Sequence, residues 1–213
     1  YEIRNCDWSS DVCSSDLERL ADEACRIEIE ILGKPIGKQD QYIAAYGGLC
    51  ALAFHRDGSV GVERLGLGPE RLRELGDHLH LFYTGRTRRA DEILSEQKGQ
   101  TGARSAELDG IKKLALELKP ELERGRLDRL GETLHANWEL KRKLASGISD
   151  GPIESMYRLA LSHGALGGKI CGAGGGGFLL VYCPPEQWSR LARGMREYRS
   201  LPFRLEDRKS TRL

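Results

Sequence analysis

The alternation of apolar and polar residues predicts helices over most of the chain, with short apolar strands between them. The first helix is predicted by apolar residues at spacings of four, three and four, namely Leu20, Ala24, Ile27 and Ile31. Gly33 and Pro35 end this helix, because both residue types are poor helix formers. Residues 49–65 then predict two strands joined at Asp57-Gly58, a dipeptide typical of hairpin turns.

From residue 67 onward the apolar runs predict a less regular order of elements. Helices are expected at 67–78, 88–98, 103–118, 127–144, 151–163 and 185–199, and strands at 80–85, 178–183 and 202–206. Strands and helices do not alternate regularly, so the predicted fold class is α+β rather than a doubly wound parallel sheet. We expect a domain boundary near Gly76–His80, between the first helix and hairpin and this second unit.

One stripe of the helix expected at 127–144 recurs every three or four residues. Its members are Leu127, Leu130, Leu134, Trp138, Lys141 and Leu144. Because the stripe is almost wholly apolar, we expect Trp138 to lie in the core rather than to serve as a ligand platform.

A run of glycines, "KICGAGGGGFLLVYC" at 169–183, is the most unusual segment of the chain. Gly172, Gly174 and Gly177 match the spacing of the dinucleotide-binding fingerprint, but a helix is expected before the run and a strand after it, which is the wrong context. No Gly-Lys-Ser/Thr closes the run, so it is not a Walker A loop. Two interpretations remain: a loop whose N–H groups approach a ligand, or a tight bend from helix to strand.

The composition of the chain argues against several classes of function. A net charge of +1 over 213 residues, without a block of Lys and Arg, argues against a nucleic-acid binder. The longest apolar run is far too short to span a membrane, so no membrane partner is expected. Six scattered cysteines without a metal-binding or disulfide spacing indicate a reduced, cytoplasmic environment.

The two ends of the chain differ from the rest. Residues 1–17 contain the near-repeat "SSDVCSSD" and show no helical or strand period, and residues 207–213 read "DRKSTRL". Both segments resemble adapter sequence translated at the ends of metagenomic reading frames, so we expect them to be non-native. A natural disordered terminus is the alternative.

The segments "GALGGKICGAGGGGFLL" (164–180) and "PIGKQDQYIAAYGG" (35–48) together resemble the GHMP kinases. The segments "LFYTGRTRRADEIL" and "NWELKRKLASGIS" are similar to one branch, the D-glycero-D-manno-heptose 7-phosphate kinases. The resemblance covers nearly all of residues 18–206. It implies the C-terminal part of a two-domain fold, with the end of an S5-like N-terminal domain at 18–76 and a ferredoxin-like C-terminal domain at 77–206.

The resemblance also implies roles for residues of the first unit. Asp40 matches the catalytic aspartate of the superfamily, which accepts or orients the proton of the attacking hydroxyl. Lys38 would stabilise the transferred phosphoryl group or lower the pKa of Asp40. Glu28 matches a Mg²⁺-binding glutamate, with Glu30 as the alternative. Gln41 would contact the substrate.

The remaining implied roles lie in the second unit. Lys169 would contact the substrate, and Arg88 would bind the sugar 7-phosphate through its guanidinium fork. The phosphates of ATP would lie on the glycine loop, Gly172, Ala173, Gly174, Gly175, Gly176 and Gly177. The implied cofactors are ATP and Mg²⁺, and the implied reaction places the γ-phosphate on the anomeric hydroxyl of heptose 7-phosphate.

The family has an upstream Gly-Ser-Ser loop that wraps the ATP phosphates, and this sequence has "SSDVCSSDL" at the corresponding place. We therefore expect the 213-residue chain to be an inactive fragment of an active kinase. Two alternatives stay open. One is a kinase for another sugar, such as galactose or fucose, and the other is a non-catalytic ligand-binding module on the same fold.

Overall fold

The structure is a computed structural model that describes residues 14–87 and 90–205, with the side chains described from residue 16 onward. The chain divides into two compact units, whose described parts are residues 14–64 and 65–205. The sequence places the boundary about twelve residues later, and the difference is helix α3 (Pro69–His78), which lies in the second unit. No helix in the described ranges is both long and apolar enough to cross a membrane.

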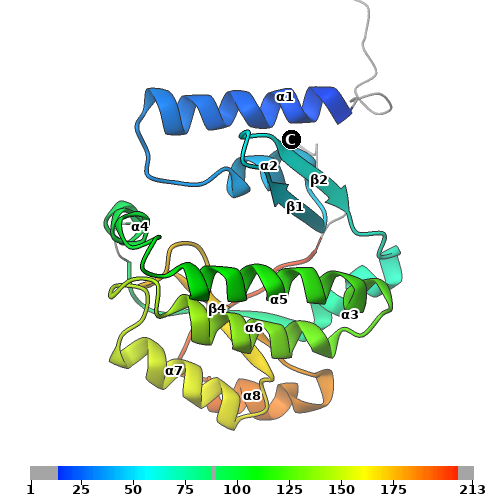
Figure 1. Ribbon diagram of the computed structural model, residues 1–213. Helices are drawn as coiled ribbons and strands as arrows, with labels where there is room; N and C mark the ends of the chain where they lie inside the picture. Colours follow the sequence, from blue (N-terminus) through cyan, green and yellow to red (C-terminus); the bar gives the residue numbers. More distant parts are fainter. Residues whose placement is uncertain (1–13, 88–89, 206–213) are drawn as a thin grey trace, which may run out of the picture. The chain divides into compact units, whose positions relative to one another are not determined.

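The first unit consists of helices and one hairpin, labelled in Figure 1. Helix α1 (Ser14–Cys25) continues into a π-helix (Arg26–Ile31), and helix α2 (Gln39–Tyr46) leads to strands β1 (Cys50–Phe54) and β2 (Val60–Arg64). The two strands pair antiparallel around the predicted turn, which confirms the hairpin. The buried core consists of Ala21, Cys25, Tyr42, Tyr46 and Val60.

The face of the first helix that carries the predicted apolar period is not the buried one. Leu20, Ile27 and Ile31 are exposed, whereas Ala21 and Cys25 are buried. The face with Ala21 and Cys25 is buried because its small residues let α2 approach closely. The Tyr42 hydroxyl then donates to Asp22 Oδ1 at 2.6 Å. The helix also begins at Ser14, inside the segment expected to lack a helical period. Leu17 packs against the same core, which accounts for this extension.

The second unit is an α+β layer, as predicted, around a four-stranded sheet in the order β4-β5-β3-β6. All three strand pairs are antiparallel. The strands are β3 (Leu79–Tyr83), β4 (Gly167–Ile170), β5 (Phe178–Tyr182) and β6 (Ser200–Leu201). The helices besides α3 are α4 (Ala90–Gly99), α5 (Ser105–Glu123), α6 (Asp128–Lys141), α7 (Gly151–Ser162), the 3₁₀ turn η2 (Pro185–Gln187) and α8 (Trp188–Gly194).

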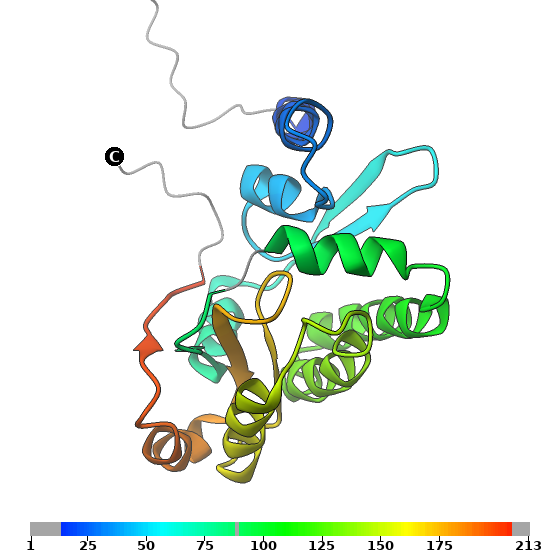
Figure 2. The same ribbon diagram turned by 90° about the vertical axis from the view of Figure 1, so that its left-hand side faces the viewer.

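One face of this sheet is buried under helices α7 and α8. Ile170, Leu179 and Phe82 lie side by side on adjacent strands, so their side chains share that face. They join a core that includes Trp138 and Met156, both nearly inaccessible to solvent, which confirms Trp138 as a core residue. Figures 1 and 2 show α5 and α6 lying side by side, with α6 against β4.

Strand β4 was not predicted, although it changes the context of the glycine run. "GGKI" contains two glycines and one lysine, so its period carries no strand signal. The final strand was also misplaced: β6 is Ser200–Leu201 and ends before Pro202, whose ring nitrogen has no hydrogen to donate to a ladder. The helix expected at 185–199 is shorter, because η2 precedes it and α8 ends at Gly194.

Helix α6 lies close to β4 because glycines occupy both sides of the contact. A Cβ added at Gly167 would lie 2.0 Å from the Gly131 carbonyl oxygen and 2.7 Å from the His135 nitrogen. A Cβ at Gly131 would lie 2.7 Å from Tyr182 Cδ1. These are backbone and ring atoms that cannot rotate away, so the separation of helix and strand depends on the missing side chains.

We predict that Gly167→Ala lowers the free energy of unfolding by about 1–3 kcal/mol, because α6 must move away from β4 to admit a methyl group. Gly99→Ala is the matched control, since an added Cβ there meets nothing within 4 Å. Urea unfolding followed by circular dichroism measures both changes. Equal stability of the two variants would contradict the steric account.

Candidate active-site segments and family

The glycine run connects two antiparallel strands, β4 and β5. Its ends are paired, because the Cys171 N–H donates to the Phe178 carbonyl at 2.9 Å. The helix expected before the run is present as α7, but strand β4 lies between that helix and the run. The dinucleotide fingerprint remains excluded, because a strand follows the run and that fingerprint requires a helix.

Two hydrogen bonds attach the middle of the loop to its neighbours. The Gly175 N–H donates to the Ile148 carbonyl at 2.8 Å, and the Gly177 N–H donates to the Arg86 carbonyl at 2.9 Å. Packing requires glycine at two further positions: a Cβ at Gly174 would lie 2.9 Å from the Ile148 backbone, and one at Gly176 would lie 2.7 Å from the Arg86 oxygen. The bend interpretation thus accounts for part of the run.

The start of the run is open to a ligand. Gly172 has φ +70° and nothing within 4 Å of an added Cβ. The N–H groups of Gly172, Ala173, Gly174 and Gly176 donate to no other group in the part of the chain that the structure describes. Unpaired N–H groups on a loop are suitable donors for an anion.

Side-chain contacts also fix the segments that surround the glycine loop. The Thr84 hydroxyl donates to the Gly177 carbonyl at 2.9 Å. Arg86 Nη1 lies 2.6 Å from Asp150 Oδ2, and Asp150 also caps α7 by accepting from the Ile153 N–H. The Thr84–Gly177 and Arg86–Asp150 contacts join residues more than sixty positions apart, so no local sequence pattern predicts them. Arg88, the predicted phosphate ligand, lies outside the described residues.

Two lysines lie beside the start of the loop. Lys141, the last residue of α6, donates from Nζ to the Gly172 carbonyl at 2.5 Å. Burial lowers the pKa of Lys141 to about 8, and the charge of Lys169 contributes further. Lys169 is on β4, and burial lowers its pKa as well. Lys141 belongs to the largely apolar stripe predicted for residues 127–144, and the sequence did not indicate a functional role for it.

The start of α2 carries the predicted catalytic residues of the first unit. Asp40 is exposed in the first turn of the helix and forms no capping bond. Lys38 donates from Nζ to the Gly58 carbonyl at 2.7 Å, so it contacts the hairpin turn. Gln41 is only 7% exposed, and its Oε1 accepts from no described residue. A buried, unpaired amide oxygen of this kind is a suitable acceptor for a ligand hydroxyl.

The two candidate metal ligands lie on the π-helix. Glu28 is partly buried and Glu30 is exposed. Short π-helical segments occur frequently at functional sites, and the sequence had predicted an ordinary helix here. Among the described residues no group of three acidic, histidine or cysteine side chains could hold a metal by itself. A Mg²⁺ ion at Glu28 would need further ligands such as phosphates.

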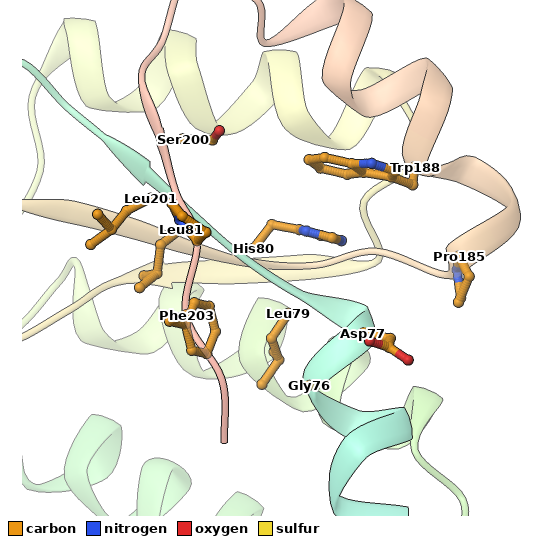
Figure 3. A pocket seen from close by; sticks show the side chains of 11 residues that line it. Gly76, Asp77, Leu79, His80, Leu81, Pro185, Trp188, Ser200, Leu201 and Phe203 are labelled. Atoms are coloured by element: carbon orange, nitrogen blue, oxygen red, sulfur yellow. The ribbon is translucent and has the colours of Figure 1, made fainter. Parts of the chain in front are cut away.

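A cavity of about 420 Å³ lies at the other edge of the sheet, beside β3 and β6 (Figure 3). The rings of His80 and Trp188 stack there with centroids 3.9 Å apart. His80 Nε2 is buried and has no hydrogen-bond partner in the described part of the chain. Burial lowers the pKa of His80 to about 4, so its ring is neutral at pH 7.

Comparisons with known proteins agree on one family. Residues 118–200 match the family described as GHMP kinases C terminal. The D-glycero-alpha-D-manno-heptose 7-phosphate kinase of Campylobacter jejuni is 33% identical over 180 residues, 84% of this chain and 53% of that enzyme. Residues 118–200 of this chain belong to the GHMP kinases. The chain spans about half the length of the curated relatives it matches.

Two further relatives agree with this family. The mevalonate kinase of Methanothermobacter thermautotrophicus is 30% identical over 171 residues, 77% of this chain and 51% of that enzyme. The crystal structure of a D-glycero-D-manno-heptose 1-phosphate kinase from Bacteroides thetaiotaomicron superposes with a TM-score of 0.63 at 25% identity, covering 88% of this chain and 52% of that one. The resemblance predicted from the sequence is therefore confirmed, together with the α+β fold.

We predict that His80 makes the stability of this chain depend on pH. Its folded-state pKa of about 4 is below the ordinary 6.5, so the unfolded chain takes up this proton first. The free energy of unfolding is therefore at its full value above pH 6.5. It decreases by roughly 3 kcal/mol as the pH falls toward 4.

Urea unfolding at pH 7 and pH 4.5 measures this loss. His80→Gln should lose less stability over that interval than the parent chain, whereas His55→Gln, at an exposed position, should lose as much as the parent. Identical pH dependence in all three proteins would show that His80 is not the group responsible.

Proposed function

We propose that this chain supplies the phosphoryl-transfer residues and one phosphate-binding loop of an ATP-dependent sugar kinase. Its acceptor is the anomeric hydroxyl of D-glycero-D-manno-heptose 7-phosphate, and the products are the 1,7-bisphosphate and ADP. The supporting observation is the 33% identity to the Campylobacter heptose 7-phosphate kinase over 84% of the chain. A match of that extent has to include both the Asp40 segment and the glycine loop, since neither lies near a terminus.

In this reaction Asp40 is the proton acceptor. The acceptor oxygen forms a bond to the γ-phosphorus, the bond from that phosphorus to the β,γ-bridging oxygen breaks, and the hydroxyl proton passes to the carboxylate. The exposure of Asp40 and its lack of a capping bond leave the carboxylate accessible to a substrate. Lys38 supplies positive charge two residues away, and its bond to Gly58 holds its stem in place.

The other residues would bind and orient the ligands. Glu28 would hold Mg²⁺ together with phosphate oxygens, which is the usual coordination of this ion in kinases. Gln41 offers its unpaired Oε1 to a sugar hydroxyl. Lys169 and the open N–H groups of the loop would bind phosphate oxygens, either of ATP or of the sugar phosphate. Arg88 keeps its proposed role toward the 7-phosphate.

Two alternatives predict different results. A kinase for galactose or fucose would use the same residues but another acceptor. A binding module on the same fold would bind the sugar without turnover, and Asp40 would then be dispensable. We place the protein in the cytoplasm, where ATP is present and thiols such as Cys25 and Cys183, free in this structure, stay reduced.

We predict that Asp40→Asn lowers kcat by about 10²- to 10⁴-fold while sugar binding is largely retained, because the amide cannot accept the hydroxyl proton. The chain covers half of its relatives, so the assay uses a chimera in which the N-terminal half of the Campylobacter enzyme precedes residues 18–205. ADP release is followed with heptose 7-phosphate, galactose and fucose as acceptors.

Asp109→Asn is the matched control, since Asp109 is an exposed helical aspartate and its variant should keep the parent rate. A chimera whose rate is unaffected by Asp40→Asn would refute catalysis by this residue and favour the binding module. Turnover confined to galactose or fucose would replace the proposed acceptor.

The choice between Glu28 and Glu30 is also testable in the chimera. We predict that Glu28→Gln raises the Mg²⁺ concentration needed for half-maximal rate by about tenfold, because one charged ligand is lost. Glu30→Gln should leave that requirement unchanged. The opposite pattern would assign the ion to Glu30, and no change in either variant would remove the π-helix from the metal site.

A further inference from the structure

Three basic residues follow one another at the end of α6, and their surroundings differ. Arg142 lies between two carboxylates, 2.7 Å from Glu139 and 2.8 Å from Glu154. Lys143 is exposed to solvent. Lys141 forms no ion pair with any carboxylate of the described residues, and its recorded partner is the Gly172 carbonyl. The charge of Arg142 is therefore compensated within the protein, and that of Lys141 is not.

Lys169 is a second uncompensated cation in the same place. It is partly buried, and no carboxylate in the described part of the chain pairs with it. The positive charge of Lys169 repels that of Lys141 and so contributes to the lowered pKa of Lys141. Two partly buried ammonium groups close to each other are unfavourable unless an anion offsets their charge.

The close packing of α6 on β4 explains why the two lysines meet. Gly131 lies against Gly167, and ten residues further along the helix Lys141 lies against Gly172. Ten helical residues span about 15 Å and five extended residues about 16.5 Å, so helix and strand reach the loop together. The register therefore brings the Lys141 ammonium to the start of the glycine loop.

The loop adds donors of its own beside the lysines. Its N–H groups at Gly172 and Ala173 donate to nothing in the described part of the chain. The third titratable group there, the Cys171 thiol, is exposed overall, yet partial desolvation raises its pKa, so it carries no negative charge at neutral pH. The titratable groups that act on Lys141 are thus one cation, Lys169, and one neutral thiol, Cys171, and neither is a carboxylate.

We propose that Lys141 and Lys169, with the unpaired N–H groups of the loop, form a binding site for a phosphate dianion. Lys141 is a phosphate-binding residue outside the glycine-rich segment 164–180. Its hydrogen bond to the Gly172 carbonyl also positions the loop. The inference deepens the proposed function, because the phosphate belongs either to the sugar phosphate or to ATP. We expect the sugar phosphate, whose monoester fits a compact pair of ammonium groups.

Binding to the 213-residue chain tests the site without any need for turnover. Isothermal titration with inorganic phosphate, glucose 6-phosphate and ATP gives three affinities for each protein. Lys141→Met and Lys169→Met should each weaken phosphate and glucose 6-phosphate binding by about tenfold or more, as expected for a lost charged hydrogen bond. Lys143→Met, two residues away and exposed, is the matched control and should bind as the parent does.

A pH series with glucose 6-phosphate separates a charged ligand from a merely structural lysine. The sugar phosphate is a dianion throughout pH 7 to 9, whereas Lys141 loses its proton near pH 8. Affinity should fall about tenfold over this interval in the parent chain. Lys141→Arg keeps its charge at every pH and should remove most of that fall.

Parent affinity for all three ligands in both methionine variants would overturn the site, as would an equal loss in Lys143→Met. A loss seen with ATP alone would support the site and assign its phosphate to the nucleotide. Failure of the proposed function is a separate result: a chimera without turnover, combined with lysine-dependent phosphate binding, would remove the kinase assignment and leave the anion site in place.

Discussion

The contact between helix α6 and strand β4 is the constraint on which the second unit depends. Backbone meets backbone there, because neither Gly131 nor Gly167 has a side chain to separate them. The same contact seals Tyr182, whose ring is inaccessible and whose hydroxyl donates to Asp128 at the start of the helix. One close approach thus holds α6 along β4 and brings the helix over β5.

The position of that helix end has chemical consequences. Arg142 is used to bind α6 to α7 through Glu154, whereas Lys141 points to the glycine loop. The loop itself has two roles. Gly174 and Gly176 are required by tight contacts with the backbone at Ile148 and Arg86. Gly175 and Gly177 donate their N–H groups to those two residues, whereas Gly172 and Ala173 keep open N–H groups. A glycine run in such a loop therefore serves packing and ligand approach together.

Much of the fold could be predicted because its signals are local. The hairpin around Asp57-Gly58, the helix containing Trp138 and the α+β order depend on periods and turn residues within a few positions. Strand β4 could not be predicted, since "GGKI" has no alternating pattern and becomes a strand only by pairing with β5. The first helix shows the opposite failure. Its apolar period marked an exposed face, because a close approach to Tyr42 requires the small residues instead.

The candidate site divides in the same way. The sequence by itself determined the family, the Asp40 segment and the glycine run, because residue type and spacing within each motif express those features. Only the tertiary structure decided which groups are unpaired: Gln41 with its buried oxygen, and Lys141 beside Lys169 without a carboxylate. Pairing depends on neighbours far away in the chain, so residues as similar in sequence context as Lys141 and Arg142 acquire different surroundings from the fold alone.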